Sequence, residues 1–443
     1  MAPRAGRTLS AERIIGMLAE ARDRTLALLA PVPDEELFVQ HDPLMSPLVW
    51  DLGHIGHFEE IWLLGNLGAG RETYGPLHGI FDPSLHPRST RAELPLPGGP
   101  ECRAHVARIR ERVVALVGSL DLGSDAPLVR DGYVFRMVLQ HEYQHNETIL
   151  QTLQLKRGDP YRPPRRRPDP DPGETAGGAA AFGEMVRFPG GRVEIGTDDR
   201  SAAYDNERPR HSVELAPFLI DAAPVTEEQY RRFVDAGGYG AAEHWSAAGR
   251  AWLRASGARA PRYWRREGTT WTVRVMDRVR RLDARRPVCH VCFHEAEAYA
   301  RYAGKRLPTA AEWEAAATWD PSTGLKRSFP WGEEEAHPGR ANLDALGFDT
   351  APVGSYHHNV SPVGCYGMIG DVWEWTSSEF LPYPGFRAFP YPEYSEVFFG
   401  DGYRVLRGGA WATRPGAIRG TFRNWDLPVR RQIFSGFRCA RDI

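Results

Sequence analysis

The sequence predicts two domains of different class, an all-α bundle followed by an α+β domain. Its 443 residues exceed what one hydrophobic core of ordinary size can organise. In the first third of the chain, apolar residues recur at three- and four-residue spacing, which is typical of amphipathic helices. The last 260 or so residues instead alternate short segments with Gly- and Pro-containing turns. We expect the boundaries to be 1–157 for the bundle, 158–182 for a linker and 183–443 for the second domain.

Four helices are expected in the first domain. They correspond to SAERIIGMLAEARDRTLALLA, SPLVWDLGHIGHFEEIWLLGNL, CRAHVARIRERVVALVGSL and DGYVFRMVLQHEYQHNETILQTLQL. Four amphipathic helices of this length are typical of a helical bundle. Ser46 and Pro47 predict the start of the second helix, with the serine as its cap and the proline at its first helical position.

The remainder of the chain predicts a linker and a mixed domain. Residues 158–182 are mostly Pro, Gly and charged residues with few apolar side chains to bury, which predicts a linker. Beyond them, short strand-like and helical segments rich in Gly, Trp and Arg indicate an α+β arrangement. We assign Trp373 and Trp375 of DVWEWT to its core. Cys289 and Cys292 form a C-x-x-C that we interpret as strand residues before a helix, without a metal or redox role.

Composition excludes several classes of partner. The formal charge is −2, from 55 basic and 57 acidic side chains, so no overall field favours nucleic acid or an anionic membrane. There is no apolar N-terminal stretch of signal-peptide length and no run of 18 apolar residues, which predicts a cytoplasmic protein. Five scattered cysteines do not make a disulfide framework, in agreement with a reducing compartment.

Three histidines predict a metal centre in the bundle. His141 and His145 lie one helical turn apart on the face expected to point inward. On the second helix His54 shares a face with apolar residues, whereas His57 lies about 60° away. Three neutral imidazoles leave up to three positions free on an octahedral ion, which suits iron(II) and dioxygen. Zinc accepts the same ligands, and HEYQH has the H-E-x-x-H spacing of zinc proteases, so a zinc hydrolase remains an alternative.

Longer motifs resemble a known family. SPLVWDLGHIGHFEEIWLL and HEYQHNETILQTL, with GDVWEWTSSEF, YRVLRGGAWA and TFRNWDLPVRRQIFSGFRCARD, are similar to the ergothioneine-biosynthesis sulfoxide synthases and the related selenoneine synthases. The resemblance runs nearly end to end. It implies a DinB-like helical half and a C-terminal half with the formylglycine-generating-enzyme (C-type-lectin-like) fold. It also implies Fe(II) held by His54, His141 and His145, and an O2-dependent C–S bond formed at imidazole C2 of Nα-trimethylhistidine (hercynine).

The resemblance also implies substrate-binding residues. Gln144 and Asn424 match residues that contact hercynine, and Trp425 could offer an aromatic face to the quaternary ammonium. For Trp425, ordinary packing is the alternative.

The sulfur donor of the better-known bacterial enzymes is γ-glutamylcysteine. Arg91, Asp426 and Arg430 match its binding residues, since guanidinium groups suit carboxylates and a carboxylate suits an ammonium. Arg88 and Arg431 are the neighbouring arginines with which Arg91 and Arg430 could be confused.

Tyr391 falls where the family has a catalytic tyrosine that delivers a proton or hydrogen atom during oxygen activation. Tyr383 and Tyr394 are the alternatives nearby. Retention of the three donor-binding residues favours a thiol peptide over a selenosugar, and selenoneine synthase is kept as the alternative function.

Two other functions fit the sequence less well. A formylglycine-generating oxidase needs a cysteine pair near the C-terminus, and only Cys439 stands there. A non-catalytic binding protein with a dimerising bundle would have no use for three inward histidines.

Overall fold

The computed structural model forms two compact units. Unit 1 is Met1–Pro164 with Asp199–Ala202, and unit 2 is Arg165–Asp198 with Ala203–Ile443. The structure describes residues 9–68, 75, 77–156, 158–164, 166–168, 183–400 and 402–443. Most of the expected linker, residues 169–182, lies outside the described residues. Within the described ranges, no helix is both long enough and apolar enough to cross a membrane.

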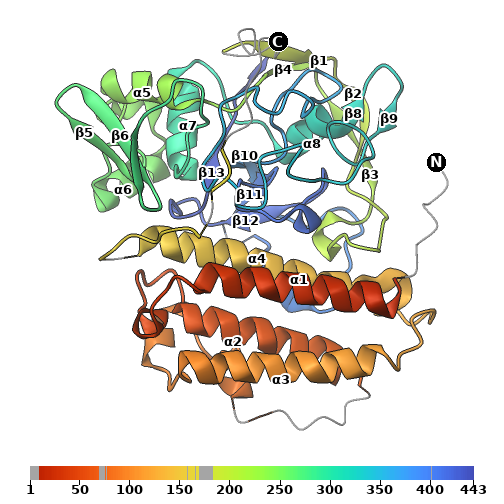
Figure 1. The fold of residues 1–443 in the computed structure, drawn as a ribbon. Coiled ribbons are helices and arrows are strands. Elements are labelled where there is room, and N and C mark those ends of the chain that lie inside the picture. Colours follow the sequence, from red (N-terminus) through yellow and green to blue (C-terminus); the bar gives the residue numbers. More distant parts are fainter. Residues whose placement is uncertain are drawn as a thin grey trace. The chain divides into compact units, whose positions relative to one another are not determined.

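Unit 1 is a bundle of four long helices, which run side by side in Figure 1. They are α1 (Ala11–Leu29), α2 (Leu48–Glu59), α3 (Gly99–Val117) and α4 (Tyr133–Leu155), and α2 continues into a π-helical turn over Glu60–Gly65. Helix α1 packs on α4 and α2 on α3, while α2 also contacts α4. Short 3-10 turns, including η3 (His78–Phe81) and η4 (Arg88–Glu93), connect them. The α-helical class predicted for this half is confirmed.

The starts of α1 and α2 are built differently. Ser10 caps α1, because its Oγ accepts a hydrogen bond from the Arg13 amide at 3.3 Å. The prediction that Ser46 caps α2 with Pro47 inside the helix is wrong. Pro47 is itself the residue before the first helical position, and the Ser46 hydroxyl accepts from Arg91 Nη1 at 2.7 Å.

A buried ionic network joins all four helices. Arg22 of α1 donates to Glu59 of α2 at 2.8 Å and to Glu142 of α4 at 2.9 Å. Arg110 of α3 donates to the carboxylate of Glu59 at 2.6 Å and to that of Glu142 at 3.3 Å. Helices α2 and α4, which carry the three histidines predicted to bind the metal, are therefore connected through two carboxylates and two guanidiniums.

Unit 2 is an α+β unit with several small sheets (Figure 1). Its central sheet has the order β12 (Asn424–Asp426), β11 (Arg404–Arg407), β10 (Trp373–Glu379) and β13 (Ser435–Gly436), antiparallel except for the β10–β13 pair. A second sheet has the order β1 (Met185–Phe188), β4 (Phe218–Asp221) and β14 (Ala440–Asp442). The other sheets are β2 (Gly191–Ile195) with β3 (His211–Leu215), β5 (Trp264–Glu267) with β6 (Thr270–Val275) and β7 (Arg278–Arg281), and β8 (Trp319–Asp320) with β9 (Leu325–Lys326).

Four helices accompany these sheets: α5 (Glu227–Asp235), α6 (Ala247–Ser256), α7 (Phe293–Tyr302) and α8 (Ala310–Thr318). The predicted α+β class is confirmed. Trp373 and Trp375 are buried in β10, as expected. Cys292, however, is the residue that precedes α7, and Cys289 lies outside the strands, so their assignment to a strand is wrong. Both are free thiols.

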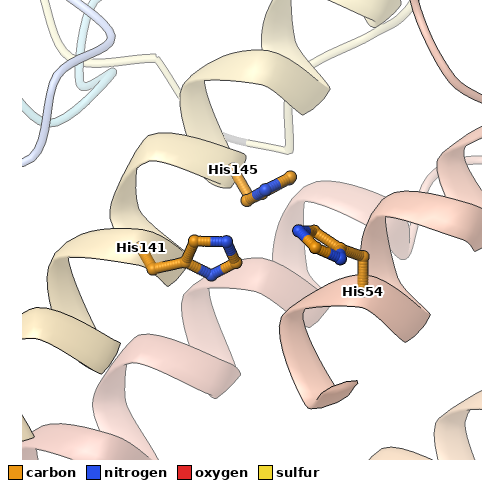
Figure 2. A group of neighbouring side chains, drawn as sticks. All are labelled: His54, His141 and His145. Carbon is orange, nitrogen blue, oxygen red and sulfur yellow. The ribbon is translucent and has the colours of Figure 1, made fainter. Parts of the chain in front are cut away.

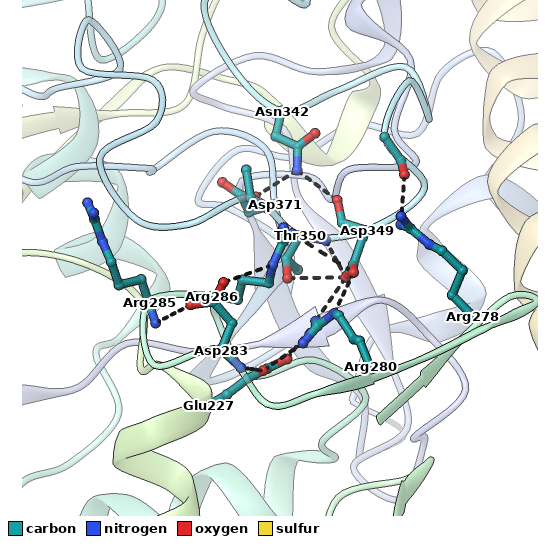
Figure 3. A network of polar contacts seen from close by, with 12 residues as sticks. Glu227, Arg278, Arg280, Asp283, Arg285, Arg286, Asn342, Asp349, Thr350 and Asp371 are labelled. Atoms are coloured by element: carbon teal, nitrogen blue, oxygen red, sulfur yellow. Dashed lines mark hydrogen bonds and ion pairs between the residues drawn. The ribbon is translucent and has the colours of Figure 1, made fainter. Parts of the chain in front are cut away.

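Buried charges hold the irregular part of unit 2 in place (Figure 3). Arg280 of β7 donates to Glu227 of α5 at 2.8 and 2.9 Å and to Asp349 at 2.7 Å. Asn342 donates to the Asp371 carboxylate at 2.8 Å and to the Asp349 carbonyl at 3.0 Å. Burial alone would raise the pKa of the Asp349 carboxyl, but the charges of Arg280 and Arg286 and the hydrogen bonds that the carboxylate accepts together lower that pKa. Long loops are thus fixed by satisfied polar groups where regular structure is missing.

Candidate metal centre

Three imidazoles from two helices converge in unit 1. His54 of α2 and His141 and His145 of α4 point toward one another in Figure 2. One ring nitrogen from each lies within 4.8 Å of the others. The ring centroids are 5.0 Å apart for His54 and His141, 4.9 Å for His54 and His145, and 4.6 Å for His141 and His145. Among the described residues this is the one group of three or more His, Cys, Asp or Glu side chains with such spacing.

His54 is fixed by its backbone partner. Its Nδ1 lies 2.9 Å from the carbonyl oxygen of Phe81, which can only accept, so Nδ1 carries the proton and Nε2 keeps its lone pair. Gly53 makes this contact possible, since a Cβ there would stand 2.1 Å from the Phe81 ring. Trp50 stacks on the His54 ring, with 4.8 Å between ring centroids. The segment that ends at Phe81 therefore selects the orientation and tautomer of His54.

His145 and His141 have supports of their own. The Nδ1 atom of His145 lies 3.3 Å from Oδ1 of Asp51, a buried carboxylate one turn before His54 on α2. This is an ion-pair distance without the alignment of a hydrogen bond. His141 stacks on Phe58, with 3.7 Å between centroids and 9° between planes. Metal-binding histidines are commonly oriented by such a carboxylate or carbonyl on the far nitrogen.

The electrostatics favour neutral, ligating rings. Burial first, and then the neighbouring His145, lower the pKa of both His54 and His141 well below the ordinary value for histidine. Near neutral pH these rings are uncharged and offer a lone pair to a cation. The donor set thus fits a divalent transition metal, and three histidines would leave coordination positions open.

Glu142 does not belong to this centre. Its carboxylate faces the bundle core, where it accepts from Arg22 and from Thr25 Oγ1 at 2.7 Å. A zinc protease needs the glutamate of H-E-x-x-H at the metal, where it acts on the attacking water. The geometry of Glu142 therefore argues against the zinc-hydrolase alternative.

Arg91 lies close to the histidines within unit 1. Its guanidinium stacks at 3.5 Å over Trp50, the residue that stacks on His54. Its Nε donates to the His86 carbonyl at 3.0 Å and its Nη1 to Ser46. Burial, and then the charge of Arg88, lower the pKa of Arg91 to about 10. Among the described residues, no carboxylate lies within ion-pair distance of the Arg91 guanidinium, although the charge of Asp51 acts on it from farther away and raises its pKa. An unpaired buried charge is costly unless a ligand neutralises it.

Gln144, next to His145 on α4, is half-buried. Its backbone carbonyl accepts from Thr148 Oγ1 at 3.1 Å, the ordinary back-bond of a threonine in a helix.

The other expected substrate residues lie on and after β12 in unit 2. The amide oxygen of Asn424 accepts from the Trp425 amide at 2.9 Å. Trp425 stacks on Phe380 at 4.2 Å with 7° between planes, so one of its faces is covered by packing. Asp426 and Arg430 pair with each other, with 3.2 Å between Oδ1 and Nε. Arg431, the neighbour that could be confused with Arg430, is held by Glu295 at 2.8 Å.

The three candidate tyrosines have different surroundings. Tyr391 is half-buried and its ring centroid lies 6.2 Å from that of Tyr394. Tyr394 stacks on Tyr204 at 4.1 Å. Tyr383 lies under the guanidinium of Arg423 at 4.1 Å, and burial raises its pKa to about 12. Stacking and the guanidinium thus occupy the rings of Tyr394 and Tyr383.

Sequence reasoning missed two supports of the centre. The sequence could have revealed Asp51. It is an acid on an otherwise apolar stretch of α2, three residues before His54, and it has no obvious partner within its own helix. The sequence could not have revealed the carbonyl of Phe81, since every residue has a backbone carbonyl.

Comparisons with known proteins cover both units. The family model described as the sulfatase-modifying factor enzyme 1-like domain matches residues 174–443, and that of the DinB superfamily matches residues 17–149. The hercynine oxygenase of Mycobacterium tuberculosis is 44% identical over 98% of this chain and 100% of its own length. That of Mycolicibacterium smegmatis is 43% identical with the same coverage. The formylglycine-generating enzyme of Streptomyces coelicolor is 34% identical over 61% of this chain and 93% of its own length.

Proposed function

The chain belongs to the family of the hercynine oxygenases, and we propose that it uses iron(II) and dioxygen to join a thiol to imidazole C2 of hercynine. The observation that carries this proposal is the convergence of His54, His141 and His145. The thiol donor in the proposal is γ-glutamylcysteine or a related thiol, and the product is a sulfoxide.

Iron(II) held by the three histidines would supply the redox chemistry that dioxygen needs. The residues of the chain prepare for it. The carbonyl of Phe81 and the carboxylate of Asp51 orient His54 and His145, and Phe58 holds the plane of His141. A ligand set fixed before the metal binds loses little entropy on binding, which favours affinity.

The proposal assigns hercynine to Gln144, Asn424 and Trp425. Among the described residues, the side-chain nitrogen of Asn424 has no acceptor, so it is available to a carboxylate or an imidazole nitrogen. The trimethylammonium group has no N–H to donate, and the electron-rich face or edge of an aromatic residue such as Trp425 is suited to it.

The proposal assigns the donor to Arg91, Asp426 and Arg430. Arg91 supports an anionic ligand, because it is a buried cation with no carboxylate at ion-pair distance in the described chain. Asp426 and Arg430 form a paired acid and base, which could separate to take the ammonium and a carboxylate of a zwitterion.

Tyr391 is the proposed catalytic residue, and its phenol O–H delivers a proton or hydrogen atom in the bond-forming path. The overall step balances: the C2–H and S–H bonds break, a C–S bond forms, one oxygen atom of O2 stays on sulfur and the other leaves as water. Stacking on Tyr204 leaves the ring of Tyr394 less free for this role, and the guanidinium of Arg423 covers that of Tyr383.

The test is anaerobic incubation of the protein with iron(II) and hercynine, followed by oxygen and one candidate donor at a time. Products are identified by mass. A sulfoxide of hercynine from γ-glutamylcysteine or cysteine is the expected result. A C–Se product from a selenosugar, with none from the thiols, would instead identify a selenoneine synthase. No modified hercynine with any donor would refute the proposed function.

A further inference from the structure

Tyr391 lies in a surface segment that needs an anchor. Residues 389–395 contain only a single 3-10 turn, η9 (Pro392–Tyr394), and Pro392 and Glu393 are exposed. A group that delivers a proton or hydrogen atom must be held at a fixed point, because a misplacement of about 1 Å can cost roughly 100-fold in rate. The segment's own secondary structure is too short to provide that.

One buried carboxylate closes the segment on both sides of Tyr391. The backbone N–H of Phe389 donates to Oδ2 of Asp205 at 3.2 Å, and the hydroxyl of Ser395 donates to Oδ1 at 2.5 Å. Asp205 is 1% exposed and Ser395 is fully buried. The contacts stand two residues before and four residues after Tyr391. Charge-assisted hydrogen bonds of this kind are stronger than neutral ones.

The residues beside Asp205 contact the same segment. Asn206 Nδ2 donates to the Ser395 hydroxyl at 3.0 Å, and the Tyr204 ring stacks on Tyr394 at 4.1 Å. Arg423 in turn donates to the Asn206 carbonyl at 2.7 Å. Three consecutive residues, 204–206, therefore form one supporting surface, with the Asp205 carboxylate at its centre.

We propose that Asp205 is a positioning residue for Tyr391: it closes the 389–395 segment so that the phenol is presented at one point. This inference rests on the proposed function, in which Tyr391 acts during C–S bond formation. The hydrogen bonds that the Asp205 carboxylate accepts from the segment come from Phe389 and Ser395, so its effect on the Tyr391 phenol is transmitted through these two residues.

The product ratio reports on the phenol. In the synthase path, hercynine, thiol and O2 give the sulfoxide and water. Without a correctly placed phenol, both atoms of O2 go to the thiol sulfur, which converts the thiol to a sulfinic acid and leaves hercynine unchanged. The ratio of sulfinic acid to sulfoxide therefore rises when Tyr391 is removed or displaced.

The experiment compares Asp205→Asn with Tyr391→Phe, wild type and the control Asp442→Asn. Asp442 is an exposed carboxylate that pairs with Arg306, and it receives the same substitution. We expect Asp205→Asn to raise the ratio of sulfinic acid to sulfoxide about 10-fold or more, toward the Tyr391→Phe value. Iron content and the apparent affinities for hercynine and thiol should stay at the wild-type level, and Asp442→Asn should keep the wild-type ratio.

A purely structural role for Asp205 would lower all activity together without changing the product ratio. The wild-type ratio in Asp205→Asn, with a raised ratio in Tyr391→Phe, would overturn the positioning role and leave the proposed function standing. Absence of any sulfoxide from the wild type would refute the proposed function itself.

If Asp205→Asn does not fold, Ser395→Ala provides the same comparison, because it keeps the carboxylate and removes one of its two hydrogen bonds with the 389–395 segment. The ratio should rise in Ser395→Ala as well, and chymotrypsin should cut faster after Tyr394. An unchanged ratio together with unchanged cleavage would overturn the proposal.

Discussion

Glu142 offers a test of which face of α4 performs chemistry. We predict that Glu142→Gln destabilises unit 1 and does not remove an essential base. The substitution keeps the shape of the side chain and removes its charge. In the native structure that charge is shared by Arg22, Arg110 and the hydroxyl of Thr25, all inside the bundle.

The loss of stability in Glu142→Gln can be worked out from the charges that remain in the network. After the substitution the buried guanidinium of Arg22 and the partly buried guanidinium of Arg110 face the single carboxylate of Glu59. Removing one partner of a buried ion pair costs about 3–5 kcal/mol. Glutamine retains an acceptor oxygen, so we expect about 3 kcal/mol, the lower end of this range. For a unit of this size, 1 kcal/mol shifts Tm by about 2–4 °C, so Tm should fall by about 6–12 °C.

The assay is thermal unfolding of the metal-free protein, since a bound metal would add its own stabilisation. Glu111→Gln, at an exposed position of α3, is the matched control and should change Tm by no more than about 2 °C. The pH dependence of Tm is a second test of the charge on Glu142. Burial alone would raise the pKa of Glu142, but the charges of Arg22 and Arg110 lower it.

A carboxyl whose folded pKa is lowered contributes stability above its unfolded pKa of about 4.3, and that stability is lost as the pH falls through the folded value. The wild type should therefore lose more Tm between pH 5 and pH 3 than Glu142→Gln does. An unchanged Tm combined with loss of turnover would refute this reasoning and return Glu142 to the role of a base at the metal.

Three further predictions concern the centre and the donor. Gly53→Ala should displace Phe81 and weaken metal binding, as measured by competition with a chelator. Asp51→Ala should lower metal affinity about 10- to 100-fold in the same assay, and equal affinity would show that Asp51 does not orient its histidine. Arg430→Ala should weaken the thiol donor about 10- to 150-fold, while Arg431→Ala should chiefly lower Tm. An unchanged apparent affinity for the donor in Arg430→Ala would remove the main support for a peptide thiol.

The helical half could be predicted well, because its apolar residues and histidines recur at the period of an α-helix. The spacing of His141 and His145 places both on one face of α4, and the apolar neighbours of His54 place it on the inward face of α2. Bundle packing then leaves few ways to arrange three such rings. The convergence seen in Figure 2 follows from this pattern.

The sequence could not predict which residues far apart along the chain contact one another. The Phe81 carbonyl is 27 residues from His54, and the pair of Asp205 and Ser395 is separated by 190 residues. No periodicity connects such residues, because irregular loops bring them together. The same holds for Ser46, whose hydroxyl is taken by Arg91 although the Ser-Pro pattern predicted a cap.

Metal substitution tests the central claim most directly. Metal-free protein is reloaded with either iron(II) or zinc and mixed with hercynine, γ-glutamylcysteine and oxygen, and His141→Ala is treated in parallel. We predict about one iron per wild-type chain, the sulfoxide only from the iron form, and loss of both iron and product in His141→Ala. Undiminished iron in His141→Ala, or turnover by the zinc form with the iron form inactive, would contradict the account.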